Sequence, residues 1–217
     1  LDEKDTDGNY YLPEDQWGKY EVASNGWVVN KTTKAPYFTP GQYSFGDPNP
    51  TFIMNFINNF TISKWLNIGI QVDWIQGAHL YNQTKEWMYR DGIHSDYQQP
   101  FTINGETGAW SAFYRGVYAE RSRNGTKNYF YEDASFVRLR NVEVGVDMKH
   151  FVKAGFLRRC QVSLSGRNLW TKTKYTGMDP EVNSSNVYNV DSAWDRGTDH
   201  NTMPNLRSLM VGLSVGF

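Results

Sequence analysis

The chain has 217 residues and a formal net charge of −1, and 16% of its residues are aromatic. This near-neutral balance gives no reason to expect nucleic acid or an anionic surface as a partner. No run of about 18 apolar residues is present, so no transmembrane helix is predicted. A mean hydropathy of −0.64 with so many aromatic residues fits two classes. One is a soluble sugar-binding β-protein, and the other is an outer-membrane β-barrel with polar loops and aromatic girdles.

The first stretch, residues 1–50, reads as part of a loop. It shows no positively charged leader followed by an apolar core, and we expect the chain to be a piece of a longer protein. Asp5, Asp7 and Asn9 could offer oxygen ligands to Ca²⁺. However, Gly8 falls one place early, and no Glu stands at the expected distance. A solvated acidic loop fits the pattern better, so no metal site is predicted.

Two stretches of alternating apolar residues follow, at 51–62 and 65–76. Alternation is typical of a β-strand, because successive side chains point to opposite faces. The apolar face of the second stretch comprises Leu66, Ile68, Ile70, Val72 and Trp74. Its polar face comprises Asn67, Gly69, Gln71 and Asp73.

A third strand is predicted over 135–148, where the alternation changes phase. Val137 and Leu139 have one parity, whereas Val142, Val144 and Val146 have the other. The slip falls at Arg140–Asn141. It predicts either a β-bulge or the point at which the strand enters a new environment.

Two further strands are predicted, at 159–170 and at the C-terminal "SLMVGLSVGF" (208–217). In the first of them Cys160 occupies an apolar position, which favours a small hydrophobic side chain over a reactive thiol. The apolar face of the C-terminal strand comprises Leu209, Val211, Leu213, Val215 and Phe217. Its other face carries only small or uncharged residues.

The connections alternate between short and long. Residues 63–64 and 149–158 form the short ones, and residues 77–134 and 171–204 form the long ones. In an antiparallel meander alternate connections lie at the same end of the sheet, so residues 1–50 join the long ones. Outer-membrane barrels have short periplasmic turns and long extracellular loops. We therefore predict an all-β barrel segment. Five strands cannot close a barrel, so the segment would complete a larger wall.

Several motifs resemble one family. "FGDPNPTFIMNFINNFTI", "EDASFVRLRNVEVGV", "VSLSGRNLWTKTKYTGMDPEVN" and "PNLRSLMVGLSVGF" are similar to the SusC/RagA-type TonB-dependent outer-membrane transporters, the last three to the C-terminal end of their barrel. The resemblance covers about residues 45–76 and 131–217. Ala134 departs from the family, which usually has glycine there, and this puts a left-handed turn at that position in doubt.

The resemblance implies antiparallel strands within a 22-stranded barrel in the outer membrane of a Gram-negative bacterium of the Bacteroidota. It implies import of glycans or oligopeptides, with a SusD-like surface lipoprotein as a lid. Further partners would be the remainder of the barrel, its plug domain and the TonB complex, which contacts an N-terminal part absent from this chain. On this reading residues 1–50 form an extracellular loop, and residues 51–217 form the barrel segment with long extracellular loops at 77–134 and 171–204.

Aromatic and charged residues of the long connections are candidates for binding the ligand, because sugar rings stack on aromatic faces and acidic side chains bind hydroxyl groups. The candidates are Trp87, Tyr89, Trp110, Tyr188, Asp191, Trp194, Asp195 and Arg196. The alternative for each ring is that it packs the loops together or contacts the lid. Residues 78–92 are predicted to form a short helix ended by Gly92.

No catalytic set is found, so an enzyme is not predicted, and neither a cofactor nor a nucleic acid partner is expected. The four histidines are scattered, and none has a partner at metal-ligand spacing. The terminal aromatic with its alternating apolar residues resembles a barrel-assembly signal made of Leu209, Val211, Leu213, Val215 and Phe217. Two other readings stay open: a soluble aromatic-rich β-domain that binds carbohydrate, and a barrel receptor that mainly signals.

Overall fold

The chain forms two compact units that consist mostly of antiparallel strands with few helices. The computed structural model describes residues 1–5, 7–24, 26–39, 46–98, 101–103, 106–108, 128–152, 155–182 and 197–217. One unit comprises residues 1–45 and 83–130, and the other comprises residues 46–82 and 131–217. Among the described helices, none combines the length and the apolar character needed to cross a bilayer.

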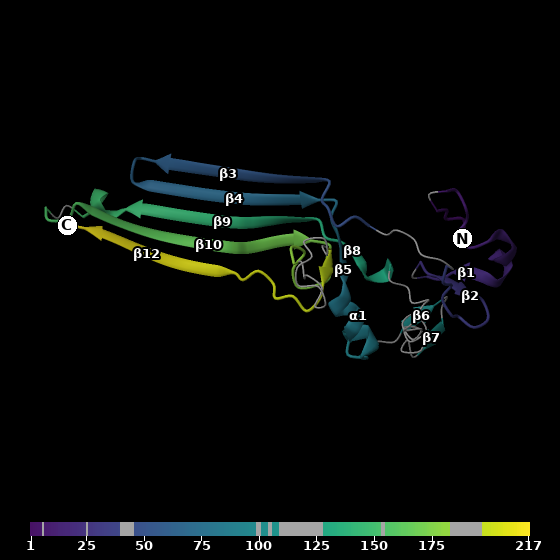
Figure 1. Ribbon diagram of the computed structural model, residues 1–217. Helices are drawn as coiled ribbons and strands as arrows, with labels where there is room; N and C mark the ends of the chain where they lie inside the picture. Colours follow the sequence, from purple (N-terminus) through teal and green to yellow (C-terminus); the bar gives the residue numbers. More distant parts are fainter. Residues whose placement is uncertain are drawn as a thin grey trace, which may run out of the picture. The chain divides into compact units, whose positions relative to one another are not determined.

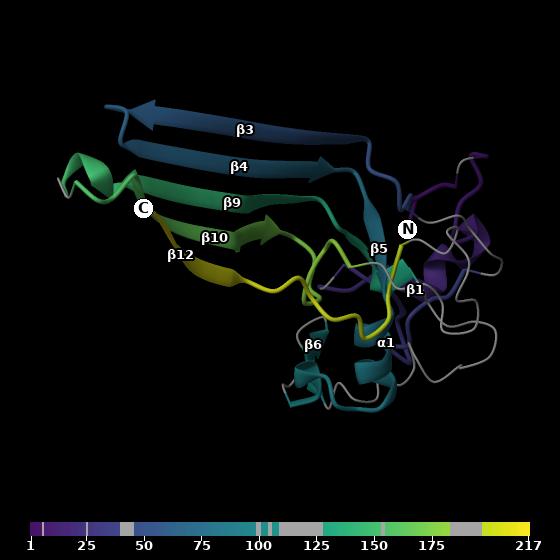
Figure 2. The same cartoon turned by 60° about the vertical axis from the view of Figure 1, so that its left-hand side comes forward.

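The second unit is built on a five-stranded antiparallel sheet in the order β12-β10-β9-β4-β3 (Figures 1 and 2). The strands are β3 (Phe52–Ile62), β4 (Leu66–Gln76), β9 (Phe136–Asp147), β10 (Arg159–Thr173) and β12 (Ser208–Gly216). All five strands predicted from the alternation are confirmed. The sheet is open, with β3 and β12 as its two edges.

The two short connections begin in different ways. After β3, Ser63 and Lys64 adopt φ values of 52° and 66°, which reverse the chain so that Ile62 pairs with Leu66. After β9 comes the 3₁₀ turn η4 (Met148–His150), which is capped where the Asp147 carboxylate accepts a hydrogen bond from the backbone N–H of Lys149 at 3.0 Å. Both connections lie at the same end of the sheet (Figure 1).

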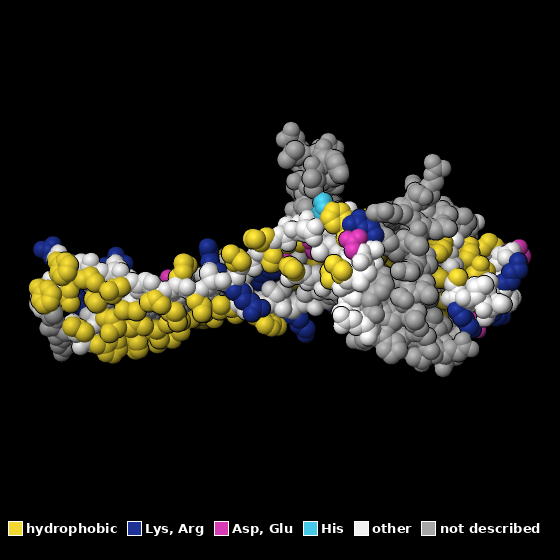
Figure 3. Space-filling model, turned by 90° about the horizontal axis from the view of Figure 1, so that it is seen from below, with side chains coloured by type: hydrophobic (Ala, Val, Ile, Leu, Met, Phe, Trp, Pro, Cys, Tyr) yellow, Lys and Arg dark blue, Asp and Glu magenta, His cyan; other side chains and the backbone are white. Residues whose placement is uncertain are grey.

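The register aligns apolar side chains across all five strands. One row runs through Phe60, Ile68, Val144, Leu164 and Val211. Because these residues pair directly across neighbouring strands, they share one face of the sheet. Figure 3, which views the sheet from the side of β12, shows hydrophobic side chains gathered on one side of it. Within the second unit, no described residue forms a layer that covers this face, and Val211 keeps 78% of its surface exposed.

The phase change in the third strand is a β-bulge. This confirms one of the two alternatives predicted for it. Gln71 of β4 pairs with Asn141, and Val72 pairs with Leu139, so Arg140 is the extra residue. The bulge keeps Leu139 and the valines that follow on the apolar face, although their spacing in the sequence is odd. A strand without the bulge would turn half of its apolar residues to the polar side.

Strand β10 has an irregularity at the same level. Arg167 pairs with Asn141 and Trp170 pairs with Leu139, so two residues of β10 lie opposite Arg140. One of them, Asn168, has a φ of 51°.

The predicted division of side chains between two faces is confirmed. The apolar face includes Ile68, Ile70, Val72, Val144, Val146 and Val211. The polar face includes Gln71, Asp73, Glu143 and Asp147. Cys160 is a free thiol opposite Val215 in an apolar row, as predicted from its position.

A smaller sheet, β11-β5-β8, continues the second unit. Its strands are β5 (His79–Asn82), β8 (Tyr131–Asp133) and β11 (Thr198–Asp199), and β11 pairs with β5 in parallel. Its hydrophobic cluster consists of Leu80, Ala134, Tyr175 and Val182. Ala134 does not adopt a positive φ, so this position accepts an alanine without backbone strain.

The helix predicted over 78–92 is shorter than expected. Residues His79–Asn82 form β5, because their backbone pairs with β8 and β11, and only Gln83–Arg90 form the helix α1. Gly92, with a φ of 71°, follows the helix, and its N–H donates to the carbonyl of Tyr89 at 3.2 Å. The predicted end of the helix was therefore correct, and its start was wrong.

The first unit contains short elements only. They are η1 (Glu14–Lys19), β1 (Tyr20–Val22), β2 (Val28–Asn30), α1, η2 (Ser95–Gln98), β6 (Phe101–Ile103), β7 (Glu106–Gly108) and η3 (Asn128–Phe130). Its described core includes Leu12, Ala23, Val29, Tyr89 and Phe130. These elements lie in the ranges 1–50 and 77–134 that the sequence presented as connections.

Candidate functional site

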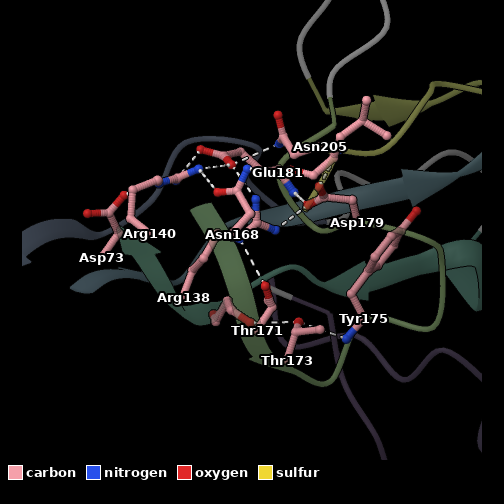
Figure 4. Close-up of polar contacts among 12 residues, drawn as sticks. Asp73, Arg138, Arg140, Asn168, Thr171, Thr173, Tyr175, Asp179, Glu181 and Asn205 are labelled. Carbon is pink, nitrogen blue, oxygen red and sulfur yellow. Dashed lines mark hydrogen bonds and ion pairs between the residues drawn. The ribbon is translucent and has the colours of Figure 1, made fainter. Parts of the chain in front are cut away.

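A cluster of charged side chains lies on the polar face, where β9 and β10 meet the smaller sheet (Figure 4). Arg138 and Arg140 of β9 are two residues apart, and both point toward the segment that follows β10. That segment, residues 174–182, brings Asp179 to Arg138 and Glu181 to both guanidinium groups. The cluster joins three strands to a piece of irregular backbone.

Arg138 is the buried member of the cluster, with 3% of its side chain exposed. Its Nη2 donates to Asp179 Oδ1 at 2.5 Å, its Nη1 donates to Glu181 Oε2 at 2.6 Å, and its Nε donates to Thr171 Oγ1 at 3.0 Å. A buried guanidinium is stable only when its donors are satisfied, and each of its three nitrogens has a partner here.

Arg140, the bulge residue, is the second arginine of the cluster. Its Nε donates to Asp73 Oδ2 at 2.5 Å, and its Nη2 donates to Glu181 Oε1 at 2.7 Å. Its Nη1 donates to Glu181 Oε2 at 2.9 Å and more weakly to Asn168 Oδ1 at 3.3 Å. The two arginines hold Glu181 between them, which fixes the segment after β10 to the sheet.

Asp179 is the acidic counterpart of Arg138. Burial acts to raise its pKa, but the hydrogen bond from Arg138 and those from the backbone N–H groups of Glu181 and Asn205 outweigh burial and lower the pKa below its ordinary value. The N–H of Asn205 lies 2.9 Å from Asp179 Oδ2. Asp179 therefore also fixes the chain that leads into β12.

Tyr175 anchors the start of the same segment. Its hydroxyl donates to Asp199 Oδ2 at 2.7 Å, and its ring lies in the hydrophobic cluster with Leu80 and Val182. Burial, together with the hydrogen bond to Asp199, raises the pKa of Tyr175 well above its ordinary value. The tyrosine is therefore a neutral donor, and it ties the segment to β11.

These contacts anchor the backbone of the segment after β10 to the sheet. In the part of the chain that the structure describes, every guanidinium nitrogen of the two arginines has an oxygen partner, so neither is free to bind an added anion. No group of three His, Cys, Asp or Glu side chains among the described residues is arranged to hold a metal. Because its carboxylates are engaged by the two arginines, the cluster holds adjoining segments in place.

Relatives of the chain are TonB-dependent receptors, although no protein-family model matches it. TonB-dependent receptor P3 of Formosa agariphila is 31% identical over 178 residues, which is 79% of this chain and 17% of that protein. TonB-dependent receptor P39 of the same organism is 30% identical over 103 residues, or 46% of this chain and 9% of that protein. The chain thus spans less than a fifth of the length of these relatives.

Solved structures agree at the level of the fold. A structure of the RagAB peptide transporter matches with a TM-score of 0.57 and 17% identity, over 92% of this chain and 22% of that one. The RagAB peptide importer in the closed-closed state matches with a TM-score of 0.53 and 19% identity, over 91% and 20%. The chain belongs to the SusC/RagA-type TonB-dependent transporters. The resemblance found in the sequence is confirmed.

Two of the predicted ligand residues of this SusC/RagA-type chain lie on α1. Tyr89 is enclosed, with 2% of its surface exposed, and it stacks on His94 at 4.3 Å between ring centroids. Arg90 lies over the ring of Trp87 at 5.0 Å. The other candidates, Trp110, Tyr188, Asp191, Trp194, Asp195 and Arg196, lie outside the described residues. The role of all eight stays a prediction.

The remaining candidates lie near the two ends of the chain. Asp5 Oδ1 accepts hydrogen bonds from the backbone N–H groups of Asp7 and Asn9, at 2.9 and 2.8 Å, so this carboxylate closes its own turn. Phe217 stacks on Phe156 with their centroids 6.3 Å apart. Leu209, Val211, Leu213 and Val215 share the apolar face of β12, and their role in assembly stays a prediction.

The charged cluster was missed in the sequence, although a signal was present. Arg138 and Arg140 are spaced as two neighbours on one face of a strand, and the phase of the strand assigns them to the polar face. A basic pair in that position needs carboxylates nearby, and the Asp179-Pro180-Glu181 motif supplies two. What the sequence could not give is that this motif folds back onto β9.

Proposed function

We propose that the chain forms the C-terminal wall of a 22-stranded outer-membrane β-barrel, and that the whole protein is a TonB-dependent importer of nutrients. The observation that carries the proposal is the apolar face, which continues across five paired strands and is preserved through a bulge. A lipid-facing wall needs such a face, and its backbone groups must all be paired. The open edges β3 and β12 would then pair with the rest of the barrel, including its first strand. Family membership favours this reading over a soluble carbohydrate-binding domain.

The orientation follows from the connections. Residues 1–50, 77–134 and 171–204 would lie outside the cell, and residues 63–64 and 149–158 would lie in the periplasm. Protease added to intact cells should then cut only within the long segments of the full-length parent. Cleavage near Lys64 or Lys153 in sealed cells would contradict this topology.

For the substrate, the proposal is a glycan taken up under a SusD-like surface lipoprotein, with the TonB complex acting through the part of the parent that precedes this chain. Support comes from the family and from the aromatic and acidic residues of the long connections, among them Trp87 and Trp194. The RagAB structures concern peptide import, so an oligopeptide is the competing substrate.

Uptake by the full-length parent separates the two substrates. Cells that carry the parent and the SusD-like lipoprotein should take up labelled oligosaccharide. Trp87→Ala or Trp194→Ala should lower this uptake while the surface abundance of the parent stays unchanged. Uptake of oligopeptides with no uptake of oligosaccharides would replace the glycan by a peptide. Uptake of neither, with a correctly assembled barrel, would favour a signalling receptor.

A further inference from the structure

A lysine lies on the apolar face of the sheet. Lys172 of β10 pairs with Val137, which pairs with Trp74, which pairs with Met54. Lys172 is therefore the only charged member of an otherwise apolar row. It is exposed, and it makes no ion pair with any described residue.

This row lies at the end of the face that adjoins the smaller sheet. The neighbouring row, further from the smaller sheet, contains Trp170, Leu139, Val72 and Phe56. Trp170 is therefore the next residue of β10 on the same face as Lys172. Tryptophan is enriched where hydrocarbon meets headgroups, and a lysine in such a position extends its ammonium group out of the hydrocarbon. The two side chains mark the level of the headgroups on this wall.

More positive charge lies beside Lys172. Lys174 is two residues further on, just beyond the end of β10, and Arg207 immediately precedes β12, the strand that pairs with β10. Both are exposed. The pKa of Asp133 is lowered chiefly by a hydrogen bond from Ser135 and less by the charge of Lys174. Asp133 thus offsets part of one of the three charges. Figure 3 shows basic side chains at the end of the hydrophobic band.

The opposite face offers a contrast at a similar level. On that face Arg138 and Arg140 form ion pairs with carboxylates. Neither Lys172 nor Arg207 contacts a carboxylate among the described residues. An uncompensated basic group beside hydrocarbon attracts anionic headgroups. In the orientation proposed above, this end of the sheet lies in the outer leaflet.

We propose that Lys172, Lys174 and Arg207 bind the phosphate groups of a phosphorylated glycolipid of the outer leaflet. The two lysines contact the headgroup from the end of β10, Arg207 contacts it from the position before β12, and Trp170 packs on the acyl chains. This inference rests on the proposed function, because it requires the apolar face to lie in lipid.

The test uses the full-length parent, purified in mild detergent and stripped of bound lipid. The probes are a purified phosphorylated outer-leaflet glycolipid, the same glycolipid after dephosphorylation, and phosphatidylglycerol, each titrated and followed by native mass spectrometry. The variant is Lys172→Gln with Lys174→Gln. The matched control is Arg167→Gln, which removes one charge from an exposed side chain of the same strand on the polar face.

Binding of the phosphorylated glycolipid should weaken by about 20-fold in the double variant and by less than about twofold in the control. Equal binding by the double variant and the native protein would overturn the proposal. Equal binding of the dephosphorylated glycolipid would also overturn it, and so would binding of phosphatidylglycerol at the same affinity.

A further variant, Val144→Arg, separates the glycolipid site from the proposed barrel wall. If it leaves assembly intact, the membrane-facing assignment fails. If it impairs assembly while the double variant binds normally, only the glycolipid site is wrong.

Discussion

The five-stranded sheet and the charged cluster at its end are stabilised in different ways. In the sheet, residues spaced by two in sequence become a continuous apolar face through regular pairing, and neighbouring rows repeat the same contact. In the cluster, each contact is unique: Arg138 binds Asp179 across 41 residues of sequence. A change in the sheet therefore acts through the environment of one face, whereas a change in the cluster leaves a specific charge without its partner.

Removing Arg138 should have the largest effect. Arg138→Met keeps the bulk of the side chain but leaves Asp179 buried and unpaired, which costs about 3–5 kcal/mol. The apparent melting temperature of the full-length parent in detergent should fall, and proteolysis should become faster within residues 174–182. Arg167→Met is the control, because that side chain is exposed and has no ion pair among the described residues.

A double variant sharpens this result. Arg138→Met with Asp179→Asn removes the buried charge as well, so part of the lost stability should return. If the double variant is as unstable as the sum of the two single variants, the pair is not coupled, and the cluster is not the anchor described here.

The two faces of the sheet should differ in their response to one added charge. Ile70→Arg places a guanidinium on the apolar face, at a cost of about 2–4 kcal/mol near the middle of the bilayer. Gln71→Arg places it on the polar face, where the cost should be small. The fraction of folded barrel, read from its mobility on a gel without heating, should fall only for Ile70→Arg. Equal losses would mean that the apolar face does not meet lipid.

The hydroxyl of Tyr175 offers a smaller test on the side of the cluster. Tyr175→Phe keeps the ring in its hydrophobic cluster but leaves Asp199, which is 4% exposed, without this donor, at about 1–3 kcal/mol. Thermal unfolding of the parent measures the loss. Tyr10→Phe is the control, since that hydroxyl makes no hydrogen bond to the described residues. An unchanged melting temperature for Tyr175→Phe would show that β11 is held by other contacts.

At the end of β12, Phe217 should influence assembly more than transport. Its stacking on Phe156 is worth about 0.5–1.5 kcal/mol, so deletion of Phe217 should lower the amount of barrel in the outer membrane. Uptake per assembled molecule should stay near normal. Surface abundance measured beside uptake decides the matter. Normal abundance with lost uptake would assign Phe217 to the ligand path.

The smallest expected effect is a dependence on pH. Because the folded state lowers the pKa of Asp179, the carboxylate stabilises the fold above its unfolded pKa of about 3.9. That contribution is lost as the pH falls below this value and through the folded pKa. Melting temperatures measured between about pH 6 and pH 3 should fall more steeply for the native parent than for Asp179→Asn. Parallel curves would mean that the titration of Asp179 is not linked to folding.

Much of the sheet could be predicted because each part of it depends on local periodicity. The five long strands, the two faces and the bulge at Arg140 all follow from the parity of apolar residues, which the pleat of a strand converts directly into faces. The short strand β5 was not predicted. Residues His79–Asn82 look helical in sequence, and they take their conformation from pairing with β8 and β11.

The sequence by itself therefore determined the strands, their faces and the family, since apolar alternation and local motifs need no distant partner to be read. Only the tertiary structure decided that Asp179 and Glu181 fold back onto Arg138 and Arg140, and that Tyr175 reaches Asp199. These contacts join residues separated by 24 to 43 positions. Their geometry depends on where an irregular segment leaves one strand and returns, and no periodic pattern encodes that path.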